Sequence, residues 1–167
     1  MSTRKRLLIV LAVTALMVMA FAVPAFAEPF SIAGHDYLYA KTPVEGAAWT
    51  ITPGGAWGKL NYKLCPRNMF MQGFAFNGHG LEAGVNYSLV NYLGWPNVAV
   101  VGTGMADEFG NVHISGKSRL ILESDGDPLL DGRAKVWLIP TANLTGNVIT
   151  IWDVPSMLFE GAGIALR

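Results

Sequence analysis

The chain has 167 residues, with 12 lysine and arginine residues, 12 aspartate and glutamate residues and a formal net charge of +0. Three of the basic residues are Arg4, Lys5 and Arg6, so residues 28–167 keep nine basic against 12 acidic residues, a net charge of −3. No lysine run or basic stripe is visible along the sequence, and this argues against nucleic acid or an anionic membrane as the main partner.

Residues 1–27 have the pattern of a signal peptide. Arg4 to Arg6 supply a positive start, Leu7 to Val23 form an unbroken apolar helix, and Ala25-Phe26-Ala27 is a small-x-small cleavage site. We therefore expect a protein that is secreted or held at the cell surface and that begins at Glu28. An uncleaved N-terminal anchor is the alternative, and only in that case is the membrane a partner.

The remaining chain has the length of one domain. We assign residues 28–46 to a lead-in strand or arm and residues 47–167 to the folded domain, because periodicity is weakest before Gly46. Cys65 is the only cysteine, so the domain has no internal disulfide. At the end of an alternating strand, Cys65 is predicted to be a buried thiol rather than a bridge between two copies.

Alternation of apolar and polar residues predicts β-strands from the start of this domain. Residues 47–52 and 56–64 flank Pro53-Gly54-Gly55 and are predicted to form a hairpin. In the second strand Leu60, Tyr62 and Leu64 share one face. Residues 68–76 are apolar on both faces, which is typical of a central strand.

Five further segments follow the same pattern. In residues 85–93 the inward positions are Val85, Tyr87, Leu89 and Leu93; in residues 111–122 they are Val112, Ile114, Leu120 and Leu122. Residues 134–140, 147–153 and 157–166 complete the set. Eight or nine strands without crossover helices predict an all-β fold, an antiparallel β-sandwich.

Two groups of residues could hold a metal ion. Asp125, Asp127 and Asp131 lie in a glycine-bearing loop whose oxygen ligands suit calcium, although the spacing matches no calcium-loop signature. The three histidines, His35, His79 and His113, could form a transition-metal site but show no ligand spacing. We expect no cofactor, with a metal- or ligand-binding domain as the alternative function.

No enzyme motif is present. The chain lacks a Gly-x-Ser-x-Gly elbow and a His-Glu-x-x-His pair, and a domain of this size has little room for a catalytic cleft. The sequence therefore predicts a protein that is not an enzyme.

The five tryptophans suggest a binding surface instead, because exposed indoles are flat apolar platforms for sugars or partner proteins. Trp95 in a turn and Trp137 on the face opposite Val136 and Leu138 are the two predicted to be exposed. Asn86 and Asn143 fit the N-glycosylation pattern and are predicted to be accessible.

Several segments resemble a family of small secreted, functionally uncharacterised domains of methanogenic archaea and some bacteria. The likeness rests on GAWGKLNY, FNGHGLEAGVNYSLVNY, GTGMADEFGNVHISG and DGRAKVWLIP and covers about residues 47 to 164. The resemblance implies an extracellular or cell-surface β-sandwich and brings no catalytic residue, substrate or cofactor.

The stretch Asn77-Gly78-His79-Gly80 is a corner rather than a site in this interpretation, with His79 bonded to the backbone or to a neighbouring strand. The whole sequence then favours a non-enzymatic extracellular or cell-surface module for binding or adhesion. Its expected partner is a surface protein, a glycan or a second copy of the chain, and not nucleic acid.

Overall fold

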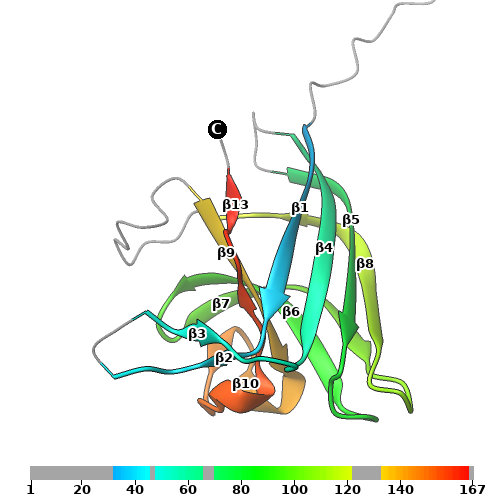
Figure 1. The fold of residues 1–167 in the computed structure, drawn as a ribbon. Helices are drawn as coiled ribbons and strands as arrows, with labels where there is room; N and C mark the ends of the chain where they lie inside the picture. The colour runs from blue at the N-terminus through cyan, green and yellow to red at the C-terminus, as the bar shows by residue number, and fades with distance from the viewer. Residues whose placement is uncertain (1–31, 46–47, 66–69, 122–132, 166–167) are drawn as a thin grey trace, which may run out of the picture.

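A computed structural model of the protein describes residues 32–45, 48–65, 70–121 and 133–165, and in these ranges the fold is all-β with antiparallel sheets (Figure 1). The predicted fold class is confirmed at this level. The signal segment, residues 1–27, lies outside the described residues. Within them the helical elements are two short 3-10 turns, η1 (Thr141–Asn143) and η2 (Val154–Ser156), and no helix there is long and apolar enough to cross a membrane.

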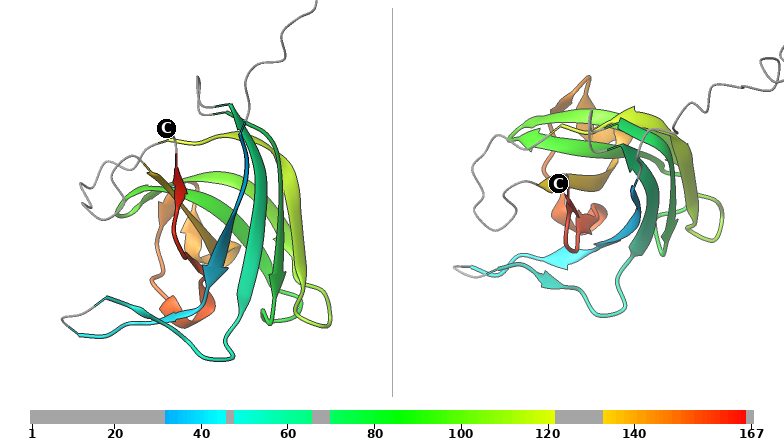
Figure 2. Two further views of the ribbon diagram at one scale, coloured as in Figure 1. Left: turned by 45° about the horizontal axis from the view of Figure 1, so that its top comes forward. Right: turned by 90° about the horizontal axis from the view of Figure 1, so that it is seen from above.

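The first sheet has five strands in the order β12-β1-β4-β5-β8. Their bounds are β12 Phe159–Glu160, β1 Ile32–Tyr39, β4 Trp57–Cys65, β5 Phe70–His79 and β8 Val112–Arg119. β1 pairs with both β12 and β4, so part of the predicted lead-in segment is an interior strand of this sheet. Seen from above, β1, β4, β5 and β8 form one curved wall (Figure 2).

The second sheet has six strands in the order β10-β11-β7-β6-β9-β13. Their bounds are β10 Leu144–Thr145, β11 Val148–Ile149, β7 Asn97–Met105, β6 Asn86–Gly94, β9 Arg133–Pro140 and β13 Ile164–Ala165. The sequence did not predict β7. Its glycines at 102 and 104 interrupt the apolar pattern, and they face close neighbours: a Cβ at Gly102 would lie 2.8 Å from the Ile114 side chain.

A separate ribbon pairs β2 (Lys41–Thr42) with β3 (Thr50–Ile51). The predicted hairpin between residues 47–52 and 56–64 is therefore wrong. β3 pairs with the preceding strand β2 and not with β4, and β4 pairs with β1 and β5. The turn itself exists: the Gly55 N–H donates to the Thr52 carbonyl at 3.0 Å.

The main core lies between the two sheets. It joins Leu60, Phe76 and Ile114 of the first sheet to Leu89 and Val136 of the second. Val112, Ile114 and Leu120 are buried in it, as the alternation predicted. Cys65 is a free, buried thiol, which confirms the expected environment of that residue.

A second core covers the opposite face of the six-stranded sheet. It contains Val90 and Ile139 from the sheet, and Val154, Met157 and Phe159 from the segment that follows β11. Burial on both faces explains why every residue of β6 from Tyr87 to Tyr92 is buried.

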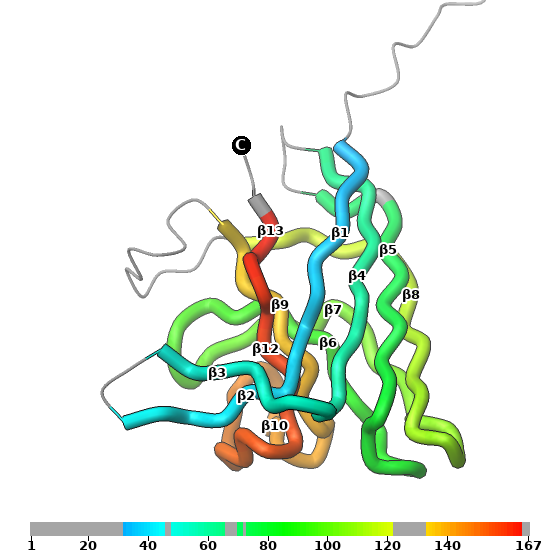
Figure 3. Tube along the Cα trace, in the orientation of Figure 1, coloured from blue at the N-terminus to red at the C-terminus, as the bar shows by residue number. Residues whose placement is uncertain are grey.

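The segment that carries β12 and β13 runs between β9 and β1 and connects the two sheets (Figure 3). Leu138 of β9 and Leu158 exchange two backbone hydrogen bonds of 2.9 Å. Nearer the start of the same strand, Ile164 pairs with Ala134. This segment therefore places the second core directly beside the first sheet.

Candidate functional site

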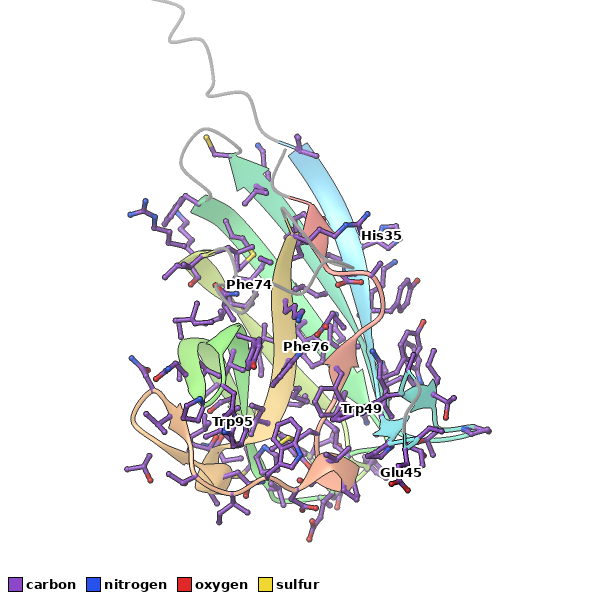
Figure 4. All side chains as sticks on the ribbon, turned by 90° about the vertical axis from the view of Figure 1, so that its left-hand side faces the viewer. His35, Glu45, Trp49, Phe74, Phe76 and Trp95 are labelled. Atoms are coloured by element: carbon purple, nitrogen blue, oxygen red, sulfur yellow. The ribbon has the colours of Figure 1, made fainter. Side chains whose placement is uncertain are left out.

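Three exposed tryptophans come together beside the second core, from three separate parts of the chain. Trp95 lies in the turn between β6 and β7, Trp49 precedes β3, and Trp152 lies between β11 and η2. Their exposed fractions are 56 %, 37 % and 42 %. We call these three residues the indole cluster; Figure 4 labels Trp49 and Trp95, which lie toward opposite sides of it in that view.

Trp152 is the centre of the indole cluster. Its ring centroid lies 5.0 Å from that of Trp95, with the two planes at 83°, and 6.0 Å from that of Trp49, with the planes at 51°. Trp95 and Trp152 line an open groove of about 330 Å³. The indoles therefore form a corner rather than one flat surface.

Buried aromatic rings pack against the indole cluster on its core side. Trp137 stacks on Tyr92 at 4.1 Å and packs edge-on against Phe159 at 5.2 Å. Its centroid lies 5.9 Å from that of Trp152, and Phe159 also contacts Trp49 at 5.1 Å. Because these rings are held by the second core, the exposed indoles rest on a packed base.

The expected exposure of Trp137 is wrong: only 8 % of this residue is accessible. Alternation along β9 correctly placed Trp137 opposite Val136 and Leu138, but that face is covered by the second core instead of water. Trp49 and Trp152, which sequence reasoning did not select, are the partners of Trp95. The excess of tryptophan was the only signal for them in the sequence.

A buried carboxylate, Glu160, lies next to Trp137. Burial raises the pKa of Glu160 to about 7. The backbone N–H of Glu160, the ammonium groups of Lys41 and Lys135 and, least of all, the Trp137 indole N–H act in the opposite direction and lower this pKa. Lys41 is held there by a 2.7 Å hydrogen bond that its Nζ donates to the Glu160 carbonyl. Glu160 Oε2 and Trp137 Nε1 make no hydrogen bond of normal geometry within the described residues, so the indole N–H acts on this carboxyl group only weakly.

A second buried carboxylate, Asp36, points toward the main core from β1. Its Oδ1 accepts hydrogen bonds from the backbone N–H groups of Tyr37 at 2.8 Å and Ala162 at 3.3 Å. Burial raises the pKa of Asp36, and these N–H groups and the Arg133 guanidinium oppose the shift. Asp36 thereby ties β1 to the turn before β13.

The histidines occupy separate positions and do not form a metal site. His79 Nδ1 lies 2.8 Å from Asn111 Oδ1, and His113 Nδ1 lies 2.8 Å from Asn77 Oδ1. His35 projects from β1 away from the indole cluster (Figure 4). In the described ranges, no three histidine, cysteine or acidic side chains are close enough to share a metal ion.

Residues 77–79 end strand β5 and are not part of the predicted corner, which begins at the next residue. His79 is held by side chains rather than by backbone carbonyls. Asp107 accepts hydrogen bonds from the Asn111 backbone N–H at 2.8 Å and from Asn111 Nδ2 at 3.3 Å. These bonds, the Asn111 backbone N–H foremost, lower the pKa of Asp107. Trp57 packs on the His79 ring at 4.8 Å. The arrangement connects β4, β5 and the β7–β8 turn.

The other predicted site residues have different outcomes. Asn86 is exposed at the start of β6, whereas Asn143 is buried in η1, so its predicted accessibility is wrong. The backbone carbonyl of Asn143 accepts a hydrogen bond from the Thr150 N–H at 2.9 Å, so the segment that the sequence treated as an open loop is folded back after the β10–β11 turn. Asp125, Asp127 and Asp131 lie outside the described residues, and the calcium alternative stays a prediction.

Comparison with known proteins found no matching family model, curated protein or solved structure.

Proposed function

We propose that this protein is a non-enzymatic, secreted or cell-surface β-sandwich module for binding or adhesion, and that its indole cluster binds a glycan. The observation that carries the proposal is the perpendicular contact of Trp95 and Trp152, two exposed indoles fixed on a buried aromatic base. Exposed rings of this kind offer apolar faces to the C–H groups of a sugar ring while its hydroxyl groups stay in water.

The size of the groove favours a glycan over the other partner classes. A groove of about 330 Å³ is on the scale of small-ligand sites, which measure roughly 300–1,000 Å³. A stable protein interface instead needs about 800 Å² from each partner. A partner protein or a second copy would have to use much more surface than these two indoles.

A glycan array with the purified protein tests the proposal. The W95A/W152A variant should lose at least roughly tenfold in affinity for any glycan that binds, because both walls of the groove are removed. The control is Phe109→Ala, which removes an exposed ring, 78 % accessible, from the distant β7–β8 turn. Circular dichroism and a thermal melt must show that both variants fold.

The outcomes separate a glycan from a second copy of the chain. Glycan binding that survives in W95A/W152A would contradict the proposed site. An array without hits, together with dimers that dissociate in W95A/W152A by analytical ultracentrifugation, would replace the glycan with a second copy of the chain.

A further inference from the structure

Strand pairing gathers basic and aromatic side chains on the outer face of the five-stranded sheet. One cross-strand row runs through Tyr39, Trp57 and His79 and continues to Asn111 by a side-chain hydrogen bond; another runs through Tyr37, Lys59, Asn77 and His113. The next row has His35, Asn61, Ala75 and Ser115. We call these three rows, together with Lys63, Lys117 and Arg119 beyond them, the basic face.

The charge carried by the strands of this face has one sign, and the Asp107 carboxylate, bonded to Asn111, lies beside its aromatic end. Lys59, Lys63, Lys117 and Arg119 are four of the nine basic residues that follow the signal segment, and each occupies an outward position. β1, β4, β5 and β8 contain a single acidic residue, Asp36, and it is buried on the opposite face. In the part of the chain that the structure describes, these four cations form no ion pair, so their charge is available to a ligand.

Aromatic rings occupy one end of the basic face. Tyr37 stacks near Tyr39 with centroids 6.2 Å apart and lies 6.5 Å from Trp57, which is 41 % exposed. The Lys59 ammonium lies 5.5 Å from the centre of the Tyr37 ring. Toward the other end, the surface of β5 carries little side-chain volume. Ala75 is small, and a Cβ at Gly73 would have no neighbour within 4 Å.

Two imidazoles on this face present hydrogen-bond acceptors. Asn111 Nδ2 donates to Asp107, which turns the Asn111 Oδ1 toward His79. An amide oxygen only accepts, so His79 Nδ1 is the donor and, in the neutral ring, Nε2 is an acceptor. The bond between His113 and Asn77 Oδ1 has the same consequence for His113. Hydroxyl groups of a ligand can donate to both.

We propose that the basic face binds an acidic polysaccharide, a chain of sugar rings that carries carboxylate or sulfate groups. The sugar rings stack on Trp57 and Tyr37, the hydroxyl groups meet the imidazoles and amides, and the anionic groups lie over Lys59, Lys63 and Lys117. Single-stranded nucleic acid would also use rings and cations. The choice of a polysaccharide rests on the proposed extracellular function and on the net charge of −3 on residues 28–167, which repels an extended polyanion elsewhere on the molecule.

The test is titration of the purified protein with polygalacturonate, dextran sulfate, neutral dextran and a single-stranded DNA oligonucleotide. We expect binding to at least one of the two acidic polysaccharides, none to neutral dextran, and affinity that falls with added salt. The variant K63Q/K117Q should bind roughly tenfold more weakly, because two exposed ionic contacts are lost.

A matched control separates a local site from a general charge effect. The variant N97D/N147D also lowers the net charge by two, at exposed positions of the six-stranded sheet and its β10–β11 turn. It should change the affinity less than twofold. Equal weakening in both variants would overturn the basic face as the site, and tighter binding of DNA than of either polysaccharide would overturn the ligand class.

The variant W95A/W152A separates a failure of this inference from a failure of the proposed glycan site. It should keep its affinity for the acidic polysaccharide, because the indole cluster lies beside a different sheet. Loss of that affinity in W95A/W152A would move the acidic site to the indoles and overturn this inference. If no polyanion binds while the array hits still require Trp95 and Trp152, the inference fails and the proposed function stands.

Discussion

Glu160 makes folding stability depend on pH at the scale of one residue. Its pKa, about 7 in the folded chain, lies above the ordinary value of 4.5 because the carboxyl group is buried. A raised carboxyl pKa means that the folded state binds the proton more tightly. The stability linked to this proton is therefore complete below pH 4.5 and is lost as the pH rises through 7.

Replacement of Glu160 by glutamine should remove this pH dependence. At pH 8, E160Q should be more stable than the original chain by up to about 3 kcal/mol, since the amide needs no proton to stay neutral. At pH 4 the two proteins should unfold at nearly the same urea concentration. The control E82Q removes an exposed carboxylate and should show no such difference. A gain for E160Q that is equal at pH 4 and pH 8 would contradict this assignment.

At the scale of elements, the β5–β6 corner and the β7–β8 turn pack together through glycine. The Leu81 N–H donates to the Gly110 carbonyl at 3.0 Å, and a Cβ at Gly110 would collide with the backbone oxygen of Leu81. Gly84 has a similar positive φ, +75° against +73°, but no atom lies within 4 Å of its Cβ position. The two glycines share the backbone requirement and differ in the space around them.

G110A should therefore destabilise the protein more than G84A. Both variants place alanine in the left-handed region, at about 1–2 kcal/mol each, and the collision with Leu81 adds about 1–3 kcal/mol in G110A. Urea unfolding of both variants measures the difference. Equal losses would mean that the two turns can move apart at no cost.

The sequence predicted single elements well where one face is in water and the other in the core. The alternation of residues 56–64 and 111–122 correctly predicted strands at β4 and β8 and the inward positions Leu60, Val112 and Ile114. The pairing of β3 was wrong, because a local turn around Gly54 does not determine which distant strand is the partner. The sequence predicts only a lead-in strand or arm for residues 28–46 and misses β7, because glycines at 34, 102 and 104 replace apolar residues at inward positions.

The candidate sites could not be predicted because both are made by long-range pairing. Trp49, Trp95 and Trp152 are separated in the sequence and meet only through the second core. Lys59 and Lys117 are likewise far apart, so the sequence showed no basic stripe, yet the antiparallel register places both on one face. Sequence composition indicated the residue types, tryptophan above all, but not their neighbours.

At the scale of the whole molecule, two cores share the six-stranded sheet. Ile114 belongs to the main core and Ile139 to the second, on opposite faces of that sheet. The Leu138–Leu158 hydrogen bonds join the sheet to the segment that covers the second core. Because both cores depend on the same strands, we expect them to unfold together in a single transition.

Paired conservative substitutions test two points: whether the two cores unfold together, and whether a change in the packing of one core leaves the packing of the other unaffected. I114V and I139V each remove one buried methylene-sized group and should each cost about 0.5–1.5 kcal/mol. The double variant should lose the sum of the two within about 0.5 kcal/mol, because the two side chains belong to different cores, and should still unfold in one transition. Urea unfolding of variants with Trp57 replaced by phenylalanine, followed by tryptophan fluorescence, then reports the second core, and circular dichroism reports both sheets. Two separate transitions would show that the second core is an independently folding cover, and the indole cluster could then be lost without loss of the basic face.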